Sequence, residues 1–445
     1  MEYKHRSIRK LGTYNVNENI ILRERIHFIR ELKNVTIIIV RNKLHSIQLI
    51  VAKDVRNGSE LSIGDVVDFY GVLRSCKEVK ATSVKNLELH VERYEVVSKC
   101  NDLPFTVEES NNYGQVGLSK KLDNRVVDLR TELNQSIFTI RSYFLSLFRE
   151  YLHNKDFMEI NTPKLIGNKS EGGAQVFHVP YFESQAYLAQ SPQLYKQMMI
   201  NSDYGRVFEI GPVFRAENSG TKRHLCEFTG LDIEMELGVG KNHNQVINVI
   251  WKTLLHIFNN LSKYCENEIS YVRSKVGSVE LEYPNEPLCL TFLECVQLLK
   301  ESGYEQNELE DLSTENERKM GEIVKEKYGS DIFVITQYPT SCRPFYTKIE
   351  ESNSLYSNSF DIIMRGTEIS SGAQREHNYE ALVNNMERCG VSAESLKDYL
   401  VSFKYGSKPH GGCGIGLERL IYLYLGLEDV RNACLFPRDP KRLFP

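Results

Sequence analysis

The sequence lacks several features that would each indicate a particular class of protein. No apolar run approaches the roughly 18 residues that a membrane-spanning helix needs. The basic N-terminal segment has no apolar stretch of the kind found in a secretory signal. The ten cysteines include no Cys-x-x-Cys pair, which argues against a zinc site and against a redox dithiol. We therefore expect free thiols in a reducing, cytoplasmic setting.

Charge is nearly balanced over the whole chain but unevenly distributed along it. The 55 Lys and Arg residues stand against 59 Asp and Glu residues, for a net charge of -4. Residues 1–56 nevertheless contain twelve basic and only five acidic side chains. A basic segment on an acidic body indicates that a polyanion binds at one end. A chance imbalance on a solvated surface is the alternative.

Residues 19–100 contain five short runs in which apolar and polar residues alternate, separated by polar or glycine-bearing breaks. This pattern predicts a small closed β-barrel of the OB type. Such barrels bind single-stranded nucleic acid, although a barrel without a ligand is equally compatible with the pattern. Residues 1–18 are then a short basic tail. Residues 101–130 form a polar hinge that contains Pro104 and Gly114.

The rest of the sequence, residues 131–445, is predicted to form one larger domain. A helical pattern begins at Thr131, and the extended segment that follows it stops at Pro163. Residues 242–330 combine helical patterns with charged loops, and we expect them to form an insertion on the surface of this domain. Strand patterns return after residue 330.

Two predicted strands joined by a polar loop lie between Arg206 and Met235. Side chains two residues apart on a strand share a face, so Arg215 and Glu217 are expected to point the same way. Phe228 lies near the start of the returning strand. A cation, a carboxylate and an aromatic ring on one hairpin could bind a phosphate, an exocyclic amine and a base. The alternative is an exposed hairpin with ordinary surface charges.

A second hairpin, FDIIMRGTEISSG, is predicted to turn at Arg365-Gly366 and to pair residue 363 with residue 368. Asp361 then lies diagonally across from Glu368, at roughly 7–8 Å along the backbone. Two carboxylates at this spacing favour Mg²⁺ held jointly with phosphates, unless both are simply exposed acids. Ser371 faces the other side of the hairpin unless a bulge intervenes.

Two further stretches carry isolated cations. In PHGGCGIGLERL the glycines allow the backbone to approach a ligand, and Arg419 lies one helical turn later, where a terminal phosphate could bind. No GK[ST] follows, so this turn is not a Walker A loop. Gln193 and Lys196 share a helix face. Arg375 follows the second hairpin, residues 360–372, which we call the carboxylate hairpin. A lysine and an arginine that converge on a small pocket suit a dicarboxylate, whereas two surface cations are the ordinary alternative.

Taken in order, these motifs resemble those of the aspartyl-tRNA synthetases, the class IIb aminoacyl-tRNA ligases, in their eukaryotic and archaeal form. The resemblance extends from about residue 19 to residue 445 and includes the segment that ends at Pro163. It rests on FRAE at 214–217, RH at 223–224, GIGLER at 414–419, SEGG at 170–173, QSPQLYKQ at 190–197, GAQR at 372–375 and LFPRDPKRL at 435–443. It implies an α+β fold, in which an OB-type barrel precedes a catalytic domain built on an antiparallel sheet flanked by helices.

The resemblance also implies an activity and a set of site residues. The expected reaction activates L-aspartate with ATP, releases pyrophosphate and transfers aspartate to tRNA(Asp), in a cytoplasmic homodimer. ATP would be bound by Arg215, Glu217, His224, Phe228, Glu368 and Arg419, of which Arg215 and Arg419 would be catalytic. Aspartate would be bound by Ser170, Glu171, Gln193, Lys196, Asp232, Ser371 and Arg375. Mg²⁺ would be held by Asp361, Glu368 and Ser371, and the anticodon by Gln48 and Glu88.

One departure and two alternatives remain. Ile37 stands where the family places an aromatic residue for an anticodon base, and stacking can contribute about 1–3 kcal/mol per base. Anticodon affinity or discrimination is therefore expected to differ. An asparagine-specific ligase shares these motifs, but a buried Lys196 facing a neutral amide would lack its counter-charge. A catalytically inactive tRNA-binding or regulatory paralogue is disfavoured, because the phosphate-binding and carboxylate residues are intact.

Overall fold

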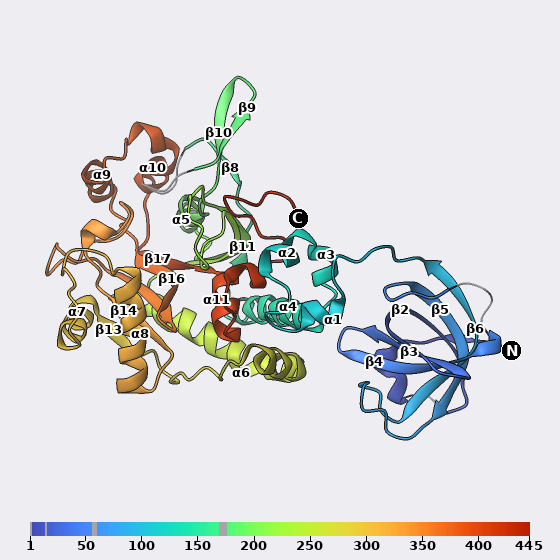
Figure 1. The fold of residues 1–445 in the computed structure, drawn as a ribbon. Coiled ribbons are helices and arrows are strands. Elements are labelled where there is room, and N and C mark those ends of the chain that lie inside the picture. The colour runs from blue at the N-terminus through green and yellow to red at the C-terminus, as the bar shows by residue number, and fades with distance from the viewer. Residues whose placement is uncertain (1, 14–15, 56–59, 169–175) are drawn as a thin grey trace. The chain divides into compact units, whose positions relative to one another are not determined.

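The computed structural model describes residues 2–13, 16–55, 60–168 and 176–445 (Figure 1). The chain divides into two compact units, residues 1–137 (the barrel unit) and residues 138–445 (the larger unit). The boundary falls within helix α4 (Glu132–His153). Among the helices in the described ranges, none has the length and apolar character required to cross a membrane.

A closed five-stranded barrel makes up most of the barrel unit. Its strands are β2 (Asn19–Glu31), β3 (Val35–Asn42), β4 (His45–Ala52), β5 (Val66–Ser75) and β6 (Leu87–Ser98). They pair in the order β2-β3-β4-β6-β5, and β5 pairs back onto β2 to close the sheet. Alternate apolar side chains such as Ile38, Leu49 and Leu89 fill the interior. The predicted OB-type barrel is therefore confirmed.

Short elements accompany the barrel within the same unit. β1 (Lys4–His5) runs parallel to β2, and η1 (Ile8–Thr13) contributes Ile8 and Leu11 to the barrel core. Residues 101–130, expected to be a polar connection, contain α1 (Val107–Asn111), α2 (Leu118–Asp123) and α3 (Arg125–Asp128). Arg125 and Asp128 form an ion pair that is almost completely buried, so some of the polar residues in this segment are interior ones.

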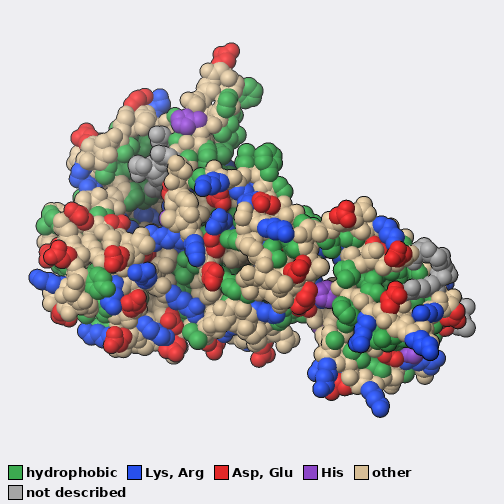
Figure 2. All heavy atoms as spheres, in the orientation of Figure 1, with side chains coloured by type: hydrophobic (Ala, Val, Ile, Leu, Met, Phe, Trp, Pro, Cys, Tyr) green, Lys and Arg blue, Asp and Glu red, His purple; other side chains and the backbone are tan. Residues whose placement is uncertain are grey.

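Charged side chains of both signs cover the barrel unit. On the face drawn in Figure 2, blue basic and red acidic side chains are interspersed over it. The surplus of basic residues near the N-terminus is therefore not gathered into one patch on that face. The OB-type architecture, rather than net charge, is the better indicator of a nucleic-acid partner.

The larger unit is built on an eight-stranded sheet. Its strands are β7 (Met158–Glu159), β11 (Arg206–Phe214), β12 (Glu227–Glu236), β13 (Cys289–Thr291), β14 (Ile332–Thr336), β15 (Ser359–Met364), β16 (Thr367–Gln374) and β17 (His410–Gly416). They follow the order β13-β14-β15-β16-β17-β12-β11-β7. The inner pairings are antiparallel, as expected, whereas β7 and β13 at the edges run parallel to their neighbours. A small second sheet contains β8 (Leu165–Ile166), β9 (His178–Tyr181) and β10 (Ser184–Leu188).

Helices pack around this sheet, as Figure 1 shows for the larger unit. They are most of α4, whose Phe148 packs against Phe208 of β11, and α5 (Gln193–Asn201), α6 (His243–Val276), α7 (Phe292–Glu301), α8 (Thr314–Tyr328), α9 (Tyr379–Arg388), α10 (Lys397–Lys404) and α11 (Leu417–Leu425). α6 packs against β15, β16 and β17 and carries the buried Trp251. The stretch 242–330 therefore supplies part of the core as well as surface helices, and its strand β13 extends the main sheet.

Candidate active site

A cavity of about 350 Å³ lies in the larger unit, and its walls come from segments far apart in the sequence. The β11–β12 hairpin, β16, the β17–α11 junction and the start of α5 all contribute to it. Ten of the predicted site residues line this cavity: Gln193, Arg215, Glu217, His224, Phe228, Asp232, Glu368, Ser371, Arg375 and Arg419. Lys196 and Asp361 lie just behind its wall. Ser170 and Glu171 are outside the described residues.

The β11–β12 hairpin carries the first group of pocket residues. β11 ends at Phe214, which pairs with Glu227, so the predicted strand was three residues too long. The backbone at Arg215 is still held next to β12, because the backbone N–H of Arg215 donates to the backbone carbonyl of Cys226 over 2.9 Å. Its guanidinium lies 3.9 Å from Glu217 Oε1 and 5.5 Å from the centroid of the Phe228 ring. The expected cation, carboxylate and aromatic ring are therefore brought together.

Arg419 connects the opposite wall of the pocket to the hairpin loop. Its Nη1 donates to the carbonyl of Glu368 over 2.9 Å, and its Nη2 donates to the carbonyl of Arg223 over 3.5 Å. His224 hydrogen-bonds Ser219 Oγ through Nδ1 over 3.2 Å. Burial, followed by the positive charge of Arg419, lowers the pKa of His224 below its ordinary value. A neutral imidazole and a fixed guanidinium therefore face the same space.

The loop between β11 and β12 is also held from outside the pocket. Arg223 forms an ion pair of 2.9 Å with Glu317 Oε2 and donates to Thr314 Oγ1 over 2.7 Å. The other carboxylate oxygen of Glu317 accepts the backbone N–H of Glu368. One side chain on α8 therefore links the hairpin loop to the carboxylate hairpin.

The carboxylate hairpin has the predicted turn and contains a bulge. Ile363 pairs with Glu368 as expected, but Ile362 pairs with Ser370, so Ile369 is an extra residue in the ladder. The bulge places Ser371 directly opposite Asp361. This is the condition under which Ser371 was expected to join the two carboxylates.

The chemistry of this hairpin fits a divalent cation shared with a ligand. Asp361 Oδ1 is buried and has no hydrogen-bond partner in the described part of the chain. Burial, followed by the charge of Asp361, raises the pKa of Glu368 to about 7. No cluster of three or more His, Cys, Asp or Glu side chains suited to a metal occurs among the described residues. Asp361, Glu368 and Ser371 would together give a divalent cation two carboxylates and one hydroxyl, which leaves coordination positions for oxygens of a bound ligand.

An arginine that the sequence did not indicate contacts two of these three residues. Arg343 Nη2 lies 2.7 Å from Asp361 Oδ2, and Nη1 donates to Ser371 Oγ over 2.9 Å. The guanidinium lies 3.9 Å from the centroid of the Tyr338 ring. Burial would lower the pKa of Arg343, but Asp361 outweighs burial and raises it. Arg343 lies in an irregular segment, so no periodicity in the sequence could have identified it.

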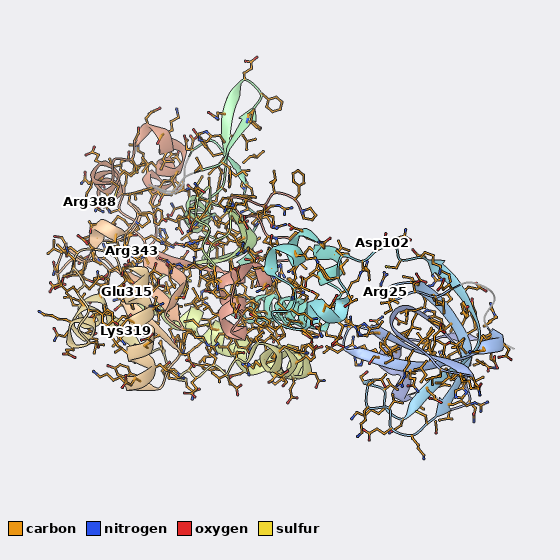
Figure 3. All side chains as sticks on the ribbon, in the orientation of Figure 1. Arg25, Asp102, Glu315, Lys319, Arg343 and Arg388 are labelled. Carbon is orange, nitrogen blue, oxygen red and sulfur yellow. The ribbon has the colours of Figure 1, made fainter. Side chains whose placement is uncertain are left out.

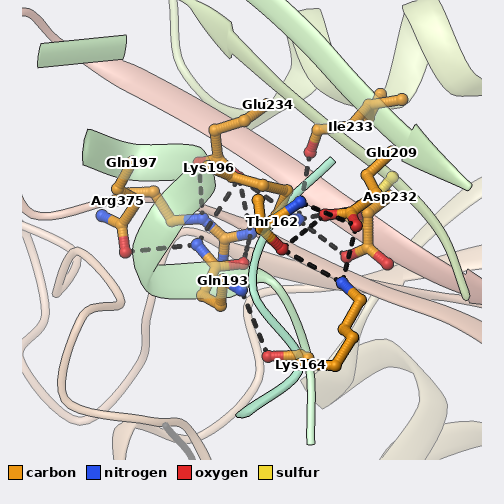
Figure 4. Close-up of polar contacts among 12 residues, drawn as sticks. Thr162, Lys164, Gln193, Lys196, Gln197, Glu209, Asp232, Ile233, Glu234 and Arg375 are labelled. Atoms are coloured by element: carbon orange, nitrogen blue, oxygen red, sulfur yellow. Dashed lines mark hydrogen bonds and ion pairs between the residues drawn. The ribbon is translucent and has the colours of Figure 1, made fainter. Parts of the chain in front are cut away.

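Lys196 and Arg375 converge beside the pocket, as predicted, but each is already paired with carboxylates (Figure 4). Lys196 Nζ lies 2.9 Å from Asp232 Oδ1 and 3.5 Å from Glu234 Oε2. Arg375 Nε lies 2.9 Å from Glu234 Oε1, and its Nη2 donates to Gln193 Oε1 over 3.0 Å. The group contains two cations and two anions, so its formal charge is balanced.

Glu234 is the second functional side chain that was missed. Burial would raise its pKa, but Arg375 and Lys196 outweigh burial and hold it below the ordinary value. The sequence does contain an indication of Glu234, because this residue follows Asp232 by two positions on β12 and therefore lies on the same face of the strand. A Cβ at Gly412 would clash with the carbonyl oxygen of Ile233 and with Glu234 Oε2, so this glycine makes room for the neighbouring strand and its carboxylate rather than for a ligand.

The barrel unit contains a separate polar group on its outer surface. Gln48 Nε2 donates to Glu88 Oε2 over 2.9 Å, so the two predicted anticodon residues are in contact. His90 Nε2 lies 2.8 Å from the other carboxylate oxygen of Glu88. Ile37 pairs with Ile50, and Ile50 pairs with His90. An aliphatic strip therefore runs beside a row of hydrogen-bonding groups.

Comparison with known proteins identifies the class. Residues 118–440 match the family described as tRNA synthetases class II (D, K and N). The chain belongs to this family of aminoacyl-tRNA synthetases. Within it, the chain is 41% identical over 456 residues to the cytoplasmic aspartate–tRNA ligase of Rattus norvegicus, covering 98% of the chain and 91% of the relative. It is 40% identical over 451 residues to cytoplasmic aspartate–tRNA ligase 1 of Arabidopsis thaliana, covering 97% and 84%.

Solved structures give the same grouping. The aspartyl tRNA synthetase of Entamoeba histolytica superposes with a TM-score of 0.90 at 37% identity and covers 100% of this chain and 93% of that one. The asparaginyl-tRNA synthetase of Pyrococcus horikoshii, complexed with asparaginyl-adenylate, gives a TM-score of 0.88 at 27% identity over 97% of both chains. The resemblance seen in the sequence motifs is confirmed.

Proposed function

We propose that the protein is an aspartate–tRNA ligase, which activates L-aspartate with ATP and transfers the aspartyl group to the 3′ end of tRNA(Asp). The observation that carries the proposal is the buried pair of cations, Lys196 and Arg375, beside the pocket that holds Arg215 and Phe228. L-Aspartate brings one ammonium and one side-chain carboxylate to this balanced group, and so leaves its charge balanced. Asparagine brings the ammonium without the carboxylate, which leaves the buried group with one uncompensated positive charge.

The nucleotide occupies the side of the cavity formed by the hairpin and α11. Phe228 stacks on the adenine, and Glu217 accepts a hydrogen bond from its exocyclic amine. Arg215 contacts the α-phosphate, and Arg419 contacts the γ-phosphate with His224 nearby. The support for these roles is that all five side chains line one cavity and that Arg215 lies 5.5 Å from the Phe228 ring centroid.

The amino acid occupies the adjoining side of the cavity. Lys196 and Arg375 receive its side-chain carboxylate, and Asp232 receives its ammonium. Gln193 and Ser371 help to position it. Ser170 and Glu171, which lie outside the described residues, are also proposed to contribute to aspartate binding.

The residues that would hold Mg²⁺ are Asp361, Glu368 and Ser371. The cation would neutralise charge on the phosphates of ATP. The unpartnered Asp361 Oδ1 supports this assignment, because a buried carboxylate oxygen that lacks a hydrogen bond is costly.

The reaction needs no nucleophile from the protein. An oxygen of the aspartate α-carboxylate attacks the α-phosphorus, and the bond from that phosphorus to the bridging oxygen breaks to release pyrophosphate. A ribose hydroxyl of the tRNA end then attacks the acyl carbon, and AMP leaves. Arg215 and Arg419 accelerate the first step by orienting the phosphates and stabilising the charge that develops on them.

The tRNA contacts both units in this proposal. Gln48 and Glu88 bind the anticodon, and the 3′ end enters the cavity of the larger unit. The protein acts in the cytoplasm, where the names of the similar ligases also place those proteins. We infer from its motifs that it is a homodimer.

The test is pyrophosphate exchange measured with aspartate and with asparagine, followed by aminoacylation of tRNA(Asp). We expect exchange with aspartate that exceeds exchange with asparagine by at least about 10³-fold, given the cost of leaving a buried charge unpaired. Arg419→Ala should reduce aspartate-dependent exchange about 100-fold, whereas Arg30→Ala, at an exposed position on β2 in the barrel unit, should not. Exchange with asparagine alone would overturn the substrate assignment, and no exchange with either would indicate a tRNA-binding protein without activity.

A further inference from the structure

Arg343, labelled in Figure 3, lines the cavity and contacts the carboxylate hairpin through Asp361. It follows the short helix η3 (Thr340–Cys342), and its side chain is 11% exposed. Tyr338 packs against one face of the guanidinium, and Asp361 and Ser371 each accept one of its Nη hydrogen bonds. Three contacts hold the charge in place, so Arg343 is not a surface arginine that can turn away into solvent.

The two oxygens of Asp361 are in different situations. Oδ2 accepts from Arg343 over 2.7 Å, whereas Oδ1 is buried and accepts from no described residue. A cation that binds Oδ1 is therefore a near neighbour of the guanidinium on the same carboxylate. Two positive charges at such a short distance repel each other strongly in a buried site, because water screens them poorly there.

Other charged groups lie around the hairpin, among them Asp311, which interacts electrostatically with both Arg343 and Asp361. Glu317 is already paired with Arg223, and among the described residues neither Glu368 nor Asp311 forms an ion pair with Arg343. Arg419 adds a further positive charge beside Glu368. The phosphates of ATP are the negative charges that would enter this site from outside the protein.

We propose that Arg343 makes Mg²⁺ binding at Asp361 and Glu368 depend on ATP. Without nucleotide, the guanidinium neutralises Asp361 and keeps the affinity for a free divalent cation low. With nucleotide, the phosphate charge offsets the guanidinium, and the cation binds. This inference rests on the metal assignment made in the proposed function. It goes beyond that assignment by naming the residue that sets the order of binding.

A purely structural role for Arg343 predicts the opposite result. If the guanidinium only braced Asp361 and Ser371, its removal would disorder these ligands and weaken cation binding. If it competes electrostatically, its removal strengthens cation binding. The sign of the change in affinity therefore separates the two roles.

The experiment measures Mn²⁺ binding to the full-length protein without nucleotide, by electron paramagnetic resonance of the free ion. We expect Arg343→Gln to bind Mn²⁺ about tenfold more tightly than the unmodified protein, and Arg343→Lys, which keeps the charge, to resemble it. Arg30→Gln removes an exposed arginine of β2 in the barrel unit and should have no effect. Adding Asp361→Asn to Arg343→Gln should abolish the gain. With a non-hydrolysable ATP analogue present, the advantage of Arg343→Gln should fall below about threefold.

Equal or weaker Mn²⁺ binding by Arg343→Gln overturns the inference, and so does the absence of Mn²⁺ binding in every variant. Should the glutamine variant fold poorly by circular dichroism, Arg343→Met provides a second neutral side chain with a similar stem beside the Tyr338 ring. Aspartate-dependent pyrophosphate exchange by the unmodified protein is measured in parallel. If exchange is present but the gain in affinity is absent, only the role of Arg343 is wrong. If exchange is absent, the proposed function fails.

Discussion

Lys196 Nζ lies 2.9 Å from Asp232 Oδ1, and the Lys196 side chain is completely buried. Its second carboxylate contact, Glu234 Oε2, lies 3.5 Å away. Because the ammonium is not hydrated, it needs these two carboxylates to offset its charge. The buried carboxylates need the ammonium for the same reason. The ammonium that we assign to the substrate carboxylate is therefore also a structural element of the sheet and of α5.

Lys196→Met should therefore lower stability and activity together. Removing one member of a buried ion pair costs about 3–5 kcal/mol, because the remaining carboxylates stay buried without a counter-charge. We expect a lower melting temperature by calorimetry and no measurable aspartate-dependent exchange. Lys408→Met removes a lysine that is half exposed and pairs with Glu236 and Asp203, and it should leave both quantities unchanged. An unchanged melting temperature for Lys196→Met would mean that water reaches the group.

Glu317→Gln should weaken ATP binding selectively. Glu317 joins Arg223 of the hairpin loop to the backbone of Glu368, and neither contact involves the aspartate side of the pocket. We expect the KM for ATP to rise about tenfold, the loss of one charge-assisted contact, while the KM for aspartate changes less than about twofold.

The matched control for this change is Glu315→Gln. Glu315 lies in the same first turn of α8 but is exposed, so its substitution reproduces the altered charge at the helix N-terminus without touching the loop. Figure 3 labels this residue. If both variants raise the KM for ATP equally, the effect comes from the helix and not from the link to Arg223.

Local patterns predicted the elements of the site better than their contacts. The turn at Arg365-Gly366 and the pairing of residues 363 and 368 follow from hairpin geometry, and both were correct. A bulge in this hairpin could be predicted only as a condition for the position of Ser371. The sequence of one strand does not show where its pairing with the neighbouring strand shifts by one residue, as it does at Ile369. The strand that ends at Phe214 was overextended, because Arg215 and Glu217 continue the alternation while their backbone leaves the sheet.

Tertiary contacts explain the rest of the differences. Arg343 belongs to an irregular segment, and its partners Asp361 and Ser371 become apparent only once that segment folds over the hairpin. The helices within residues 101–130 are each six residues or shorter, too short to produce a periodic pattern. Barrel strands were easier to predict, because they bury apolar side chains at alternate positions over much of their length, as β4 does with Ile47, Leu49 and Val51.

Glu88→Gln should separate tRNA recognition from amino-acid activation. The Glu88 side chain is 16% exposed and contacts both Gln48 and His90, so its charge organises the polar row on the barrel. We expect the KM for tRNA(Asp) to rise about tenfold, because hydrogen bonds to charged groups contribute about 1.5–3 kcal/mol. Aspartate-dependent pyrophosphate exchange should not change, since the proposed ATP and aspartate residues all belong to the larger unit. Glu95→Gln, at an exposed position on the same strand, is the control. A loss of exchange in Glu88→Gln would contradict the assignment.

Glu24 should make the stability of the barrel unit depend on pH. Glu24 lies on β2, is 9% exposed and accepts hydrogen bonds from Asn42 over 3.3 and 3.4 Å. Burial raises the pKa of this carboxyl group from 4.5 to about 7. The folded state therefore favours the protonated form, so the contribution to stability is complete below pH 4.5 and is lost as the pH rises through about 7.

Glu24→Gln should remove this dependence. Glutamine has the shape of the protonated acid and keeps a partner for Asn42, so it should raise the unfolding temperature of the barrel unit at about pH 8 and change it little at about pH 4.5. The gain at the higher pH can reach about 3 kcal/mol, the full value of the pKa shift. Scanning calorimetry at both pH values measures it, with Glu78→Gln as the control because Glu78 is exposed and pairs with Lys85 at the surface. Equal unfolding temperatures for Glu24→Gln and the unmodified protein at about pH 8 would show that Glu24 ionises without cost, as a carboxylate that water can reach would do.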